Sequence, residues 1–190
     1  MRTLLQIVSV VGSLGGIAAG QSVIFTGMNS ASPRALLSPG SWVSIYGVDF
    51  AAAPQTAQCS APLPVALGGV SITVGGALAS LSYVSPTQIN ALIPFFVTIP
   101  SVVVPLAVTT AAGSGSYNIR LTRDAPAIFT RDGSGLGMAL AFDAKFHPVA
   151  TVHPNDVIIL YAAGLVPTDD SGRVTDPVEV YLGERKAPVT

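Results

Sequence analysis

The chain has 190 residues, of which 49% are hydrophobic and 10% charged, and its formal net charge is −1. Disordered chains combine low hydrophobicity with high net charge, so this composition argues against disorder. The absence of a Lys/Arg cluster argues against a nucleic-acid partner. The single cysteine, Cys59, excludes an intrachain disulfide framework and a multi-cysteine zinc site.

The first twenty residues have the pattern of a secretory signal peptide. Arg2 precedes a mostly apolar run over residues 4–14, and small residues occupy positions 18–20. We predict that residues 1–20 are removed on export, so that the mature chain begins at Gln21 and is secreted or held at the cell surface. An uncleaved anchor and a buried first strand are the alternatives.

A second uncharged stretch, residues 89–108, has about the length of a membrane-spanning helix. It contains Pro94, Pro100 and Pro105, and proline at this density breaks a helix repeatedly. The stretch therefore favours two strands joined by a turn near residues 98–101, with a spanning helix as the alternative. No membrane span is expected after signal cleavage.

Apolar residues alternate with polar ones through the first part of the chain, with turn residues between the runs. Gly75 and Gly76 predict a hairpin, residues 113–116 predict a turn, and Pro105 suggests an edge strand. Six or seven short strands in about 100 residues are typical of an immunoglobulin-like β-sandwich, which we place at residues 21–125. The predicted core comprises Val43, Ile45, Val70, Ile72, Val74, Ile89, Leu106, Val108, Ile119 and Leu121.

The charge distribution changes near residues 120–126. Asp49 is the one charged residue between positions 35 and 119, whereas residues 120–190 carry seven basic and nine acidic residues. We therefore predict a second β module over residues 126–190. Its expected strands are residues 138–142 and 146–151 around a hairpin-sized loop, residues 156–163 as a central strand because both faces are apolar, and residues 178–182.

Two segments recur along the chain. Residues 38–48 resemble residues 153–165 at an offset of 115 positions, and residues 70–75 resemble residues 178–183 at an offset of 108. This order predicts a duplication whose second copy is incomplete, with chance similarity of strand–turn units as the alternative. A fragment of a longer secreted protein is a further expectation.

Three segments resemble those of IPT/TIG immunoglobulin-like domains. They are a Pro/Gly turn into a strand at residues 39–47, a strand and Gly hairpin at residues 70–76, and a strand closing on proline at residues 88–94. With the runs at residues 83–90, 125–130 and 156–165, the chain more closely resembles a family of uncharacterised C-terminal domains of bacterial secreted proteins. That resemblance covers residues 28–190 and implies a location and a fold, but no reaction.

We assign no catalytic, cofactor-binding or metal-binding residue. Residues 133–137 have glycine at the central position, where a Gly-x-Ser-x-Gly nucleophile elbow has its serine, and are interpreted as a loop. Asp169, Asp170, Ser171, Gly172 and Asp176 could supply oxygen ligands to Ca²⁺, but a solvated turn is the preferred interpretation.

His147 and His153 each precede a proline and are interpreted as turn-entry residues rather than metal or catalytic groups. Cys59 is expected to be an exposed or half-buried thiol, with an intermolecular disulfide as the alternative. Six aromatic residues could form a sugar-stacking or protein-binding platform, although core packing is the preferred interpretation: Trp42, Tyr46, Tyr83, Phe95, Phe96 and Phe129.

The sequence therefore predicts a non-catalytic exported β-sandwich protein with an adhesion, interaction or structural role at the cell surface. A carbohydrate-binding accessory module and a secreted hydrolase are the alternatives. Residues 156–163 contain one charge, Asp156, and the strands that would flank them have no counterpart later in the chain. We accordingly expect self-association through residues 154–190, unless a protein partner donates a strand there.

Overall fold

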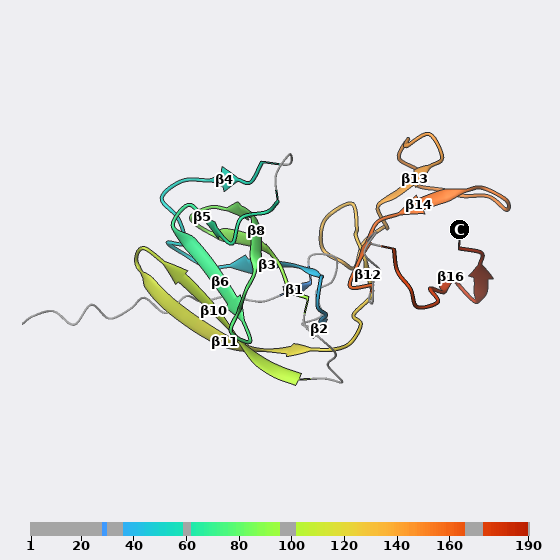
Figure 1. Cartoon of the computed structure of the whole chain (residues 1–190). Helices are drawn as coiled ribbons and strands as arrows, with labels where there is room; N and C mark the ends of the chain where they lie inside the picture. Colours follow the sequence, from blue (N-terminus) through green and yellow to red (C-terminus); the bar gives the residue numbers. More distant parts are fainter. Residues whose placement is uncertain (1–27, 30–35, 59–61, 96–101, 166–172, 190) are drawn as a thin grey trace, which may run out of the picture.

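The computed structural model describes residues 28–29, 36–58, 62–95, 102–165 and 173–189, and every regular element in these ranges is a β-strand (Figure 1). The alternating hydrophobic pattern explains this outcome, because a period of two matches a strand and leaves no apolar stripe for a helix. The predicted all-β class is confirmed. The predicted signal peptide, residues 1–20, lies outside the described residues.

The first sheet contains five strands and forms one layer of the larger part of the molecule. Its strands pair in the order β1, β3, β9, β8, β4. Ile45 lies opposite Ile89 in the β3–β9 ladder, and both side chains are fully buried. The bounds are β1 (Met28–Asn29), β3 (Trp42–Tyr46), β9 (Gln88–Leu92), β8 (Ser80–Val84) and β4 (Gln55–Thr56).

The second sheet forms the facing layer, with strands in the order β2, β11, β10, β6, β5, and with β7 paired to β6. β2 runs parallel to β11, whereas the other pairs are antiparallel. Gly75 and Gly76 join β6 to β7 with φ values of 57° and 88°, which confirms the predicted hairpin. The bounds are β2 (Leu36–Leu37), β11 (Gly113–Leu121), β10 (Val102–Thr110), β6 (Val70–Val74), β5 (Ala66–Leu67) and β7 (Ala77–Leu78).

The two sheets share one hydrophobic core. All ten predicted core residues are buried, and the most exposed of them, Ile119, has an exposed fraction of 5%. The register was therefore predicted correctly in each strand for which core residues were predicted, namely β3, β6, β9, β10 and β11. The tertiary structure adds Leu37 from the two-residue strand β2, Leu81 from β8, whose pattern is weaker, and Phe50 and Ile93 from outside the strands.

Two predictions about the second sheet are wrong. β10 is not an edge strand, since it pairs with β11 on one side and with β6 on the other. Pro105 is tolerated because it lies one position past the end of the β6–β10 ladder. Its carbonyl accepts a bond from the N–H of Gly75, so the N–H that proline lacks would point to the same place, beyond the last paired residue of β6. The predicted turn at residues 113–116 belongs to β11 instead, and the chain reverses at Ala111 and Ala112.

The predicted pair of strands over residues 89–108 is confirmed by β9 and β10, which lie in different sheets. The turn that we placed at residues 98–101 lies outside the described residues. No helix in the described part of the chain is long and apolar enough to cross a membrane.

The second part consists of three two-stranded sheets: β12 with β15, β13 with β14, and β16 with β17 (Figure 1). The prediction of a central strand over residues 156–163 is wrong, because the segment divides at Tyr161 into two strands with one neighbour each. The bounds are β12 (Ala127–Ile128), β15 (Ala162–Ala163), β13 (Ala141–Asp143), β14 (Ile158–Leu160), β16 (Val180–Leu182) and β17 (Arg185–Ala187).

The predicted hairpin around residues 143–145 forms only in part. Phe142 makes an isolated antiparallel bridge with Pro148, but residues 146–151 form no strand. His147 is followed by Pro148, which has no N–H for a ladder bond. The strand predicted over residues 178–182 is shortened to β16.

The recurring segments adopt matching local structures. In the first copy the N–H of Ser41 donates to the carbonyl of Ser38 over 3.1 Å, and 115 positions later the N–H of Asp156 donates to that of His153 over 3.1 Å. The second recurring segment forms a hairpin in both copies, β6–β7 and β16–β17. A duplication predicts both correspondences.

Candidate functional site

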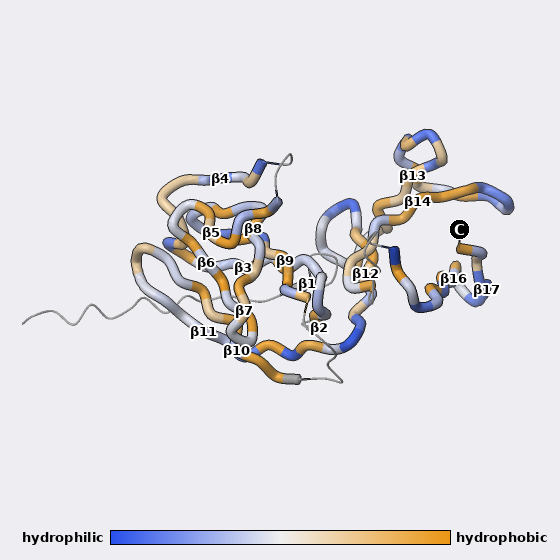
Figure 2. The backbone as a smooth tube through the Cα atoms, in the orientation of Figure 1, coloured by the Kyte–Doolittle hydropathy of each residue, from blue (hydrophilic) through white to orange (hydrophobic). Residues whose placement is uncertain are grey.

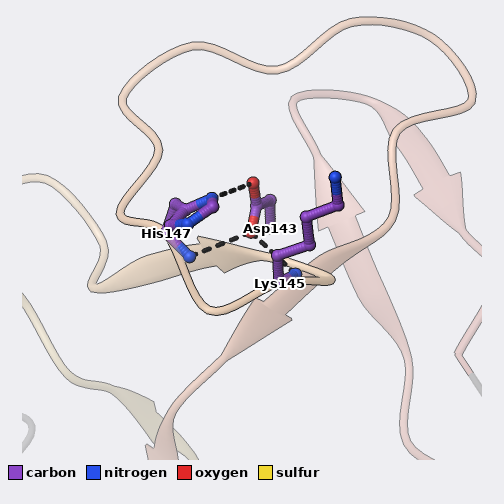
Figure 3. A network of polar contacts seen from close by, with 3 residues as sticks. All are labelled: Asp143, Lys145 and His147. Carbon is purple, nitrogen blue, oxygen red and sulfur yellow. Dashed lines mark hydrogen bonds and ion pairs between the residues drawn. The ribbon is translucent and has the colours of Figure 1, made fainter.

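An open hollow of about 570 Å³ lies between the two ends of the loop that joins β13 to β14. Val149, Val152, Val157 and Ile158 supply part of its apolar lining. The polar side chains on it include Asp143, Lys145 and His147, which Figure 3 draws from close by.

Asp143 organises the turn at one end of this loop. Its Oδ1 accepts hydrogen bonds from the backbone N–H groups of Lys145 (2.8 Å) and His147 (2.9 Å), and its Oδ2 lies 3.2 Å from Nδ1 of His147 (Figure 3). The pKa of Asp143 is held below its ordinary value of 3.8, and the hydrogen bond from the His147 N–H is the largest cause. An aspartate that accepts bonds from residues two and four positions later stabilises a turn.

A second histidine–aspartate pair lies at the other end of the loop. Oδ2 of Asp156 accepts a bond from the N–H of His153 (2.7 Å) and lies 3.4 Å from its Nδ1. The position of His153 at the start of a turn agrees with its interpretation as a turn-entry residue. Both histidine side chains are largely exposed.

Each pair has two of the three members of a hydrolytic triad. A triad also requires a nucleophile hydrogen-bonded to the other ring nitrogen of the histidine. Among the described residues, the hydroxyls of Ser41, Ser82 and Ser85 donate to backbone carbonyls and that of Ser134 donates to Asp132, so none of these four is bonded to either histidine. The carboxylate of Asp143 can orient the imidazole of His147, and the described residues show no nucleophile beside that ring.

The residues considered for a calcium site are largely outside the described residues. This holds for Asp169, Asp170, Ser171 and Gly172. Asp176 is described, and its carboxylate forms an ion pair with Arg123. No group of three or more His, Cys, Asp or Glu side chains suited to a metal ion occurs in the part of the chain that the structure describes.

The loop at residues 133–137 lies between β12 and β13, as predicted. Its shape comes from Asp132, whose Oδ1 accepts bonds from the backbone N–H and the hydroxyl of Ser134 at 3.0 and 2.8 Å. A bond from Thr130 is the largest cause that lowers the pKa of Asp132. Cys59 lies outside the described residues.

The aromatic candidates are divided between the two parts of the chain. Trp42 and Tyr46 share one face of β3, and the ladder through Ser44 and Asn90 places Tyr83 on that face as well. Tyr46 is exposed, whereas Trp42 and Tyr83 are half-buried. Of the others, Phe95 is exposed, Phe129 is half-buried near β12, and Phe96 lies outside the described residues.

The backbone of β13 shows which side of this strand faces β14. The carbonyl of Ala141 accepts a bond from the N–H of Val149, and the N–H of Asp143 donates to the carbonyl of His147. Both groups therefore point away from β14. Because backbone polar groups alternate between the two sides of a strand, Phe142 is the residue that exchanges hydrogen bonds with β14.

The opposite edge of β14 has no partner strand in the described structure. Phe142 lies opposite Ile159, so Ile159 faces β13, and the N–H and C=O groups of Ile158 and Leu160 point to the other side. β13 is the one strand that pairs with β14 among the described residues. Figure 2 shows β14 as a hydrophobic stretch, and this one-sided pairing makes it the most distinctive feature of the second part.

Sequence reasoning found the apolar character of this strand but not its neighbours. The signal that could have located the open edge was the internal repeat, since residues 158–160 align with residues 43–45 of β3. No family model matches the chain, and no curated protein matches its sequence.

Proposed function

We propose that this protein is a non-catalytic, exported β-sandwich protein with an interaction, adhesion or structural role at the cell surface. The observation that carries the proposal is the one-sided pairing of β14. Val157 and Tyr161, which flank this strand, have exposed fractions of 66% and 45%. An uncharged sheet edge flanked by exposed apolar side chains is a template for a further strand.

The strand order supports an immunoglobulin-like type for the first module. Seven of its strands, taken in chain order as A to G, are β1, β3, β6, β8, β9, β10 and β11. One sheet then has the order A-B-E-D and the other G-F-C. The sheets of a constant-type immunoglobulin domain have the same two strand orders, which supports this type. The proposal extends this to the IPT/TIG type on the sequence motifs at residues 39–47 and 70–76.

The location is proposed from the sequence pattern of residues 1–20 and from composition. A surface poor in charge does not keep copies apart by repulsion, which suits a protein that works in contact with others.

In a non-catalytic protein the Asp143–His147 pair has a structural role. Oδ1 of Asp143 is occupied by two backbone donors from its own turn, and Oδ2 faces the imidazole of His147. The carboxylate therefore serves the turn, and this turn sets the course of the chain between β13 and β14.

A labelling and binding experiment tests the function. Intact cells that express the full chain are treated with a membrane-impermeant amine reagent, and purified chain is then added to cells that lack it. We expect labelling from outside and saturable binding to the cell surface. Labelling only after lysis, or no retention on cells, would overturn the proposal. Binding that free glycans compete for, and that Tyr46→Ala abolishes, would favour the carbohydrate-binding alternative.

A further inference from the structure

The first module shows which element belongs beside a strand in the position of β14. Val43 and Ile45 of β3 correspond to Ile158 and Leu160 of β14. The backbone of β3 pairs with β9 at Val43 and Ile45, in an antiparallel ladder. Val43 and Ile45 are fully buried, whereas Ile158 and Leu160 are only half-buried.

The turn before the strand also indicates that a neighbouring strand is missing beside β14 in the described structure. In the first module, residue Ile93 closes this turn with two bonds of 2.9 Å, from the N–H of Gly40 and to the carbonyl of Ser41. The corresponding groups are the N–H of Asn155 and the carbonyl of Asp156, for which the described structure contains no backbone partner. The open edge therefore extends over about six residues and fits one antiparallel strand.

From this edge we infer that β14 pairs with β14 of a second copy of this chain, antiparallel and centred on Ile159. In that register Ile158 lies opposite Leu160 of the second copy, Ile159 opposite its own counterpart, and Val157 opposite Tyr161. Cross-strand pairs of β-branched and aromatic residues are the favourable ones in antiparallel sheets. A two-fold axis through the pair makes the contact closed rather than fibrous.

The charge pattern favours a second copy as the occupant. Residues 157–163 contain no charged side chain, and in this register Asp156 lies opposite Ala162 rather than opposite another carboxylate. Natural edges are protected against self-pairing by inward charges, proline or bulges, and none of these interrupts the described strand β14. The inference rests on the proposed interaction role and names the partner.

Disulfide trapping tests the register directly. In the proposed dimer, Ile159 and Ile159 of the second copy form a non-hydrogen-bonded pair. The Cα atoms of such a pair lie about 4.5 Å apart, which is within the range that a disulfide spans. In a full-length Cys59→Ala background, we expect Ile159→Cys to form a covalent dimer on mild oxidation. Val157→Cys and Tyr161→Cys should each crosslink poorly alone and efficiently when the two variants are mixed.

A charge substitution tests the energetics, with a matched control. Leu160→Lys places an ammonium beside the edge and should weaken self-association by roughly tenfold or more, as followed by light scattering over a concentration series. Leu78→Lys introduces the same charge on β7, whose leucine is 53% exposed, and should leave the oligomeric state unchanged. Trp42 fluorescence reports whether the first module of each variant remains folded, and the NMR signal of the His147 amide reports whether the turn between β13 and β14 is kept.

The outcomes separate the inference from the function on which it rests. A dimer with an Ile159→Cys crosslink and loss of dimer in Leu160→Lys supports both. A chain that is monomeric at high concentration but still binds cells overturns the inference alone. In that case the strand that pairs with β14 would come from a different protein. A dimer unaffected by Leu160→Lys places the interface elsewhere and also overturns the inference. A monomer without cell binding overturns both.

Discussion

Gly40 and Asn155 adopt the same left-handed backbone conformation, with φ values of 73° and 74°, at positions 115 residues apart. Each is the third residue of the turn that precedes a strand. Glycine and asparagine are the residues that enter this region most readily. The surroundings differ, because a Cβ added to Gly40 would lie 2.4 Å from a ring carbon of Phe95.

This difference predicts opposite tolerance at the two positions. Gly40→Asn should destabilise the protein by about 0.5–1.5 kcal/mol, since the new side chain must displace the exposed Phe95 ring from its present rotamer. Asn155→Gly should change the stability by less than about 1 kcal/mol. Chemical denaturation of the full chain measures both. In a Phe95→Ala background the penalty at Gly40 should shrink, and an undiminished penalty would show that the ring is not its cause.

The core register of the first module predicts a contrast between adjacent residues of β6. Ile72 is 1% exposed and faces the shared core, whereas Thr73 is half-buried on the other face. Ile72→Ala should cost about 2–5 kcal/mol of unfolding free energy, and Thr73→Ala should cost far less. Equal losses in urea denaturation would mean that the strand presents its faces differently.

The first module is also predicted to fold without the second. All residues of its hydrophobic core lie between Leu37 and Leu121. A segment of residues 21–125 should therefore unfold cooperatively, which thermal denaturation followed by circular dichroism can measure. A non-cooperative transition would mean that residues 126–190 contribute to this core.

Acid should loosen the turn at Asp143. Its pKa is lowered in the folded state, so its ionised form stabilises the fold at pH values above the unfolded pKa, and this contribution is lost as the pH falls through the lower folded value. The window therefore lies below about pH 4. NMR titration of the His147 amide should report the transition.

The main cause of this shift also yields a control. The largest stabilising bond comes from the backbone N–H of His147, so His147→Ala should keep most of the lowered pKa of Asp143. Asp143→Asn should abolish the acid transition of the amide. A return of the Asp143 pKa to its ordinary value in His147→Ala would show that the imidazole is the cause instead.

Export predicts a defined N-terminus. Arg2, the apolar run and the small residues at positions 18–20 indicate cleavage after Gly20. N-terminal sequencing of exported protein should begin near Gln21. Exported chain that retains Met1 would contradict this prediction.

The amino-acid pattern alone determined the all-β class, the glycine hairpin and the ten core residues, because side-chain alternation along a strand is a local property. Val43 and Ile45 alternate visibly in the sequence and are buried as the alternation requires. The turn geometry at Asp143 and Asp156 is equally local, because each carboxylate binds its own neighbours.

Only the tertiary structure decided which strands lie beside one another. Pro105 suggested an edge, yet β10 is central, because Pro105 lies one position past the end of β6 and its missing N–H falls outside the β6–β10 ladder. Residues 156–163 looked like a central strand by their apolar character, yet β14 has one neighbour among the strands that the structure describes. The hydrophobicity of a segment indicates which of its side chains are buried, whereas the identity of its neighbouring strands depends on segments far away in the chain.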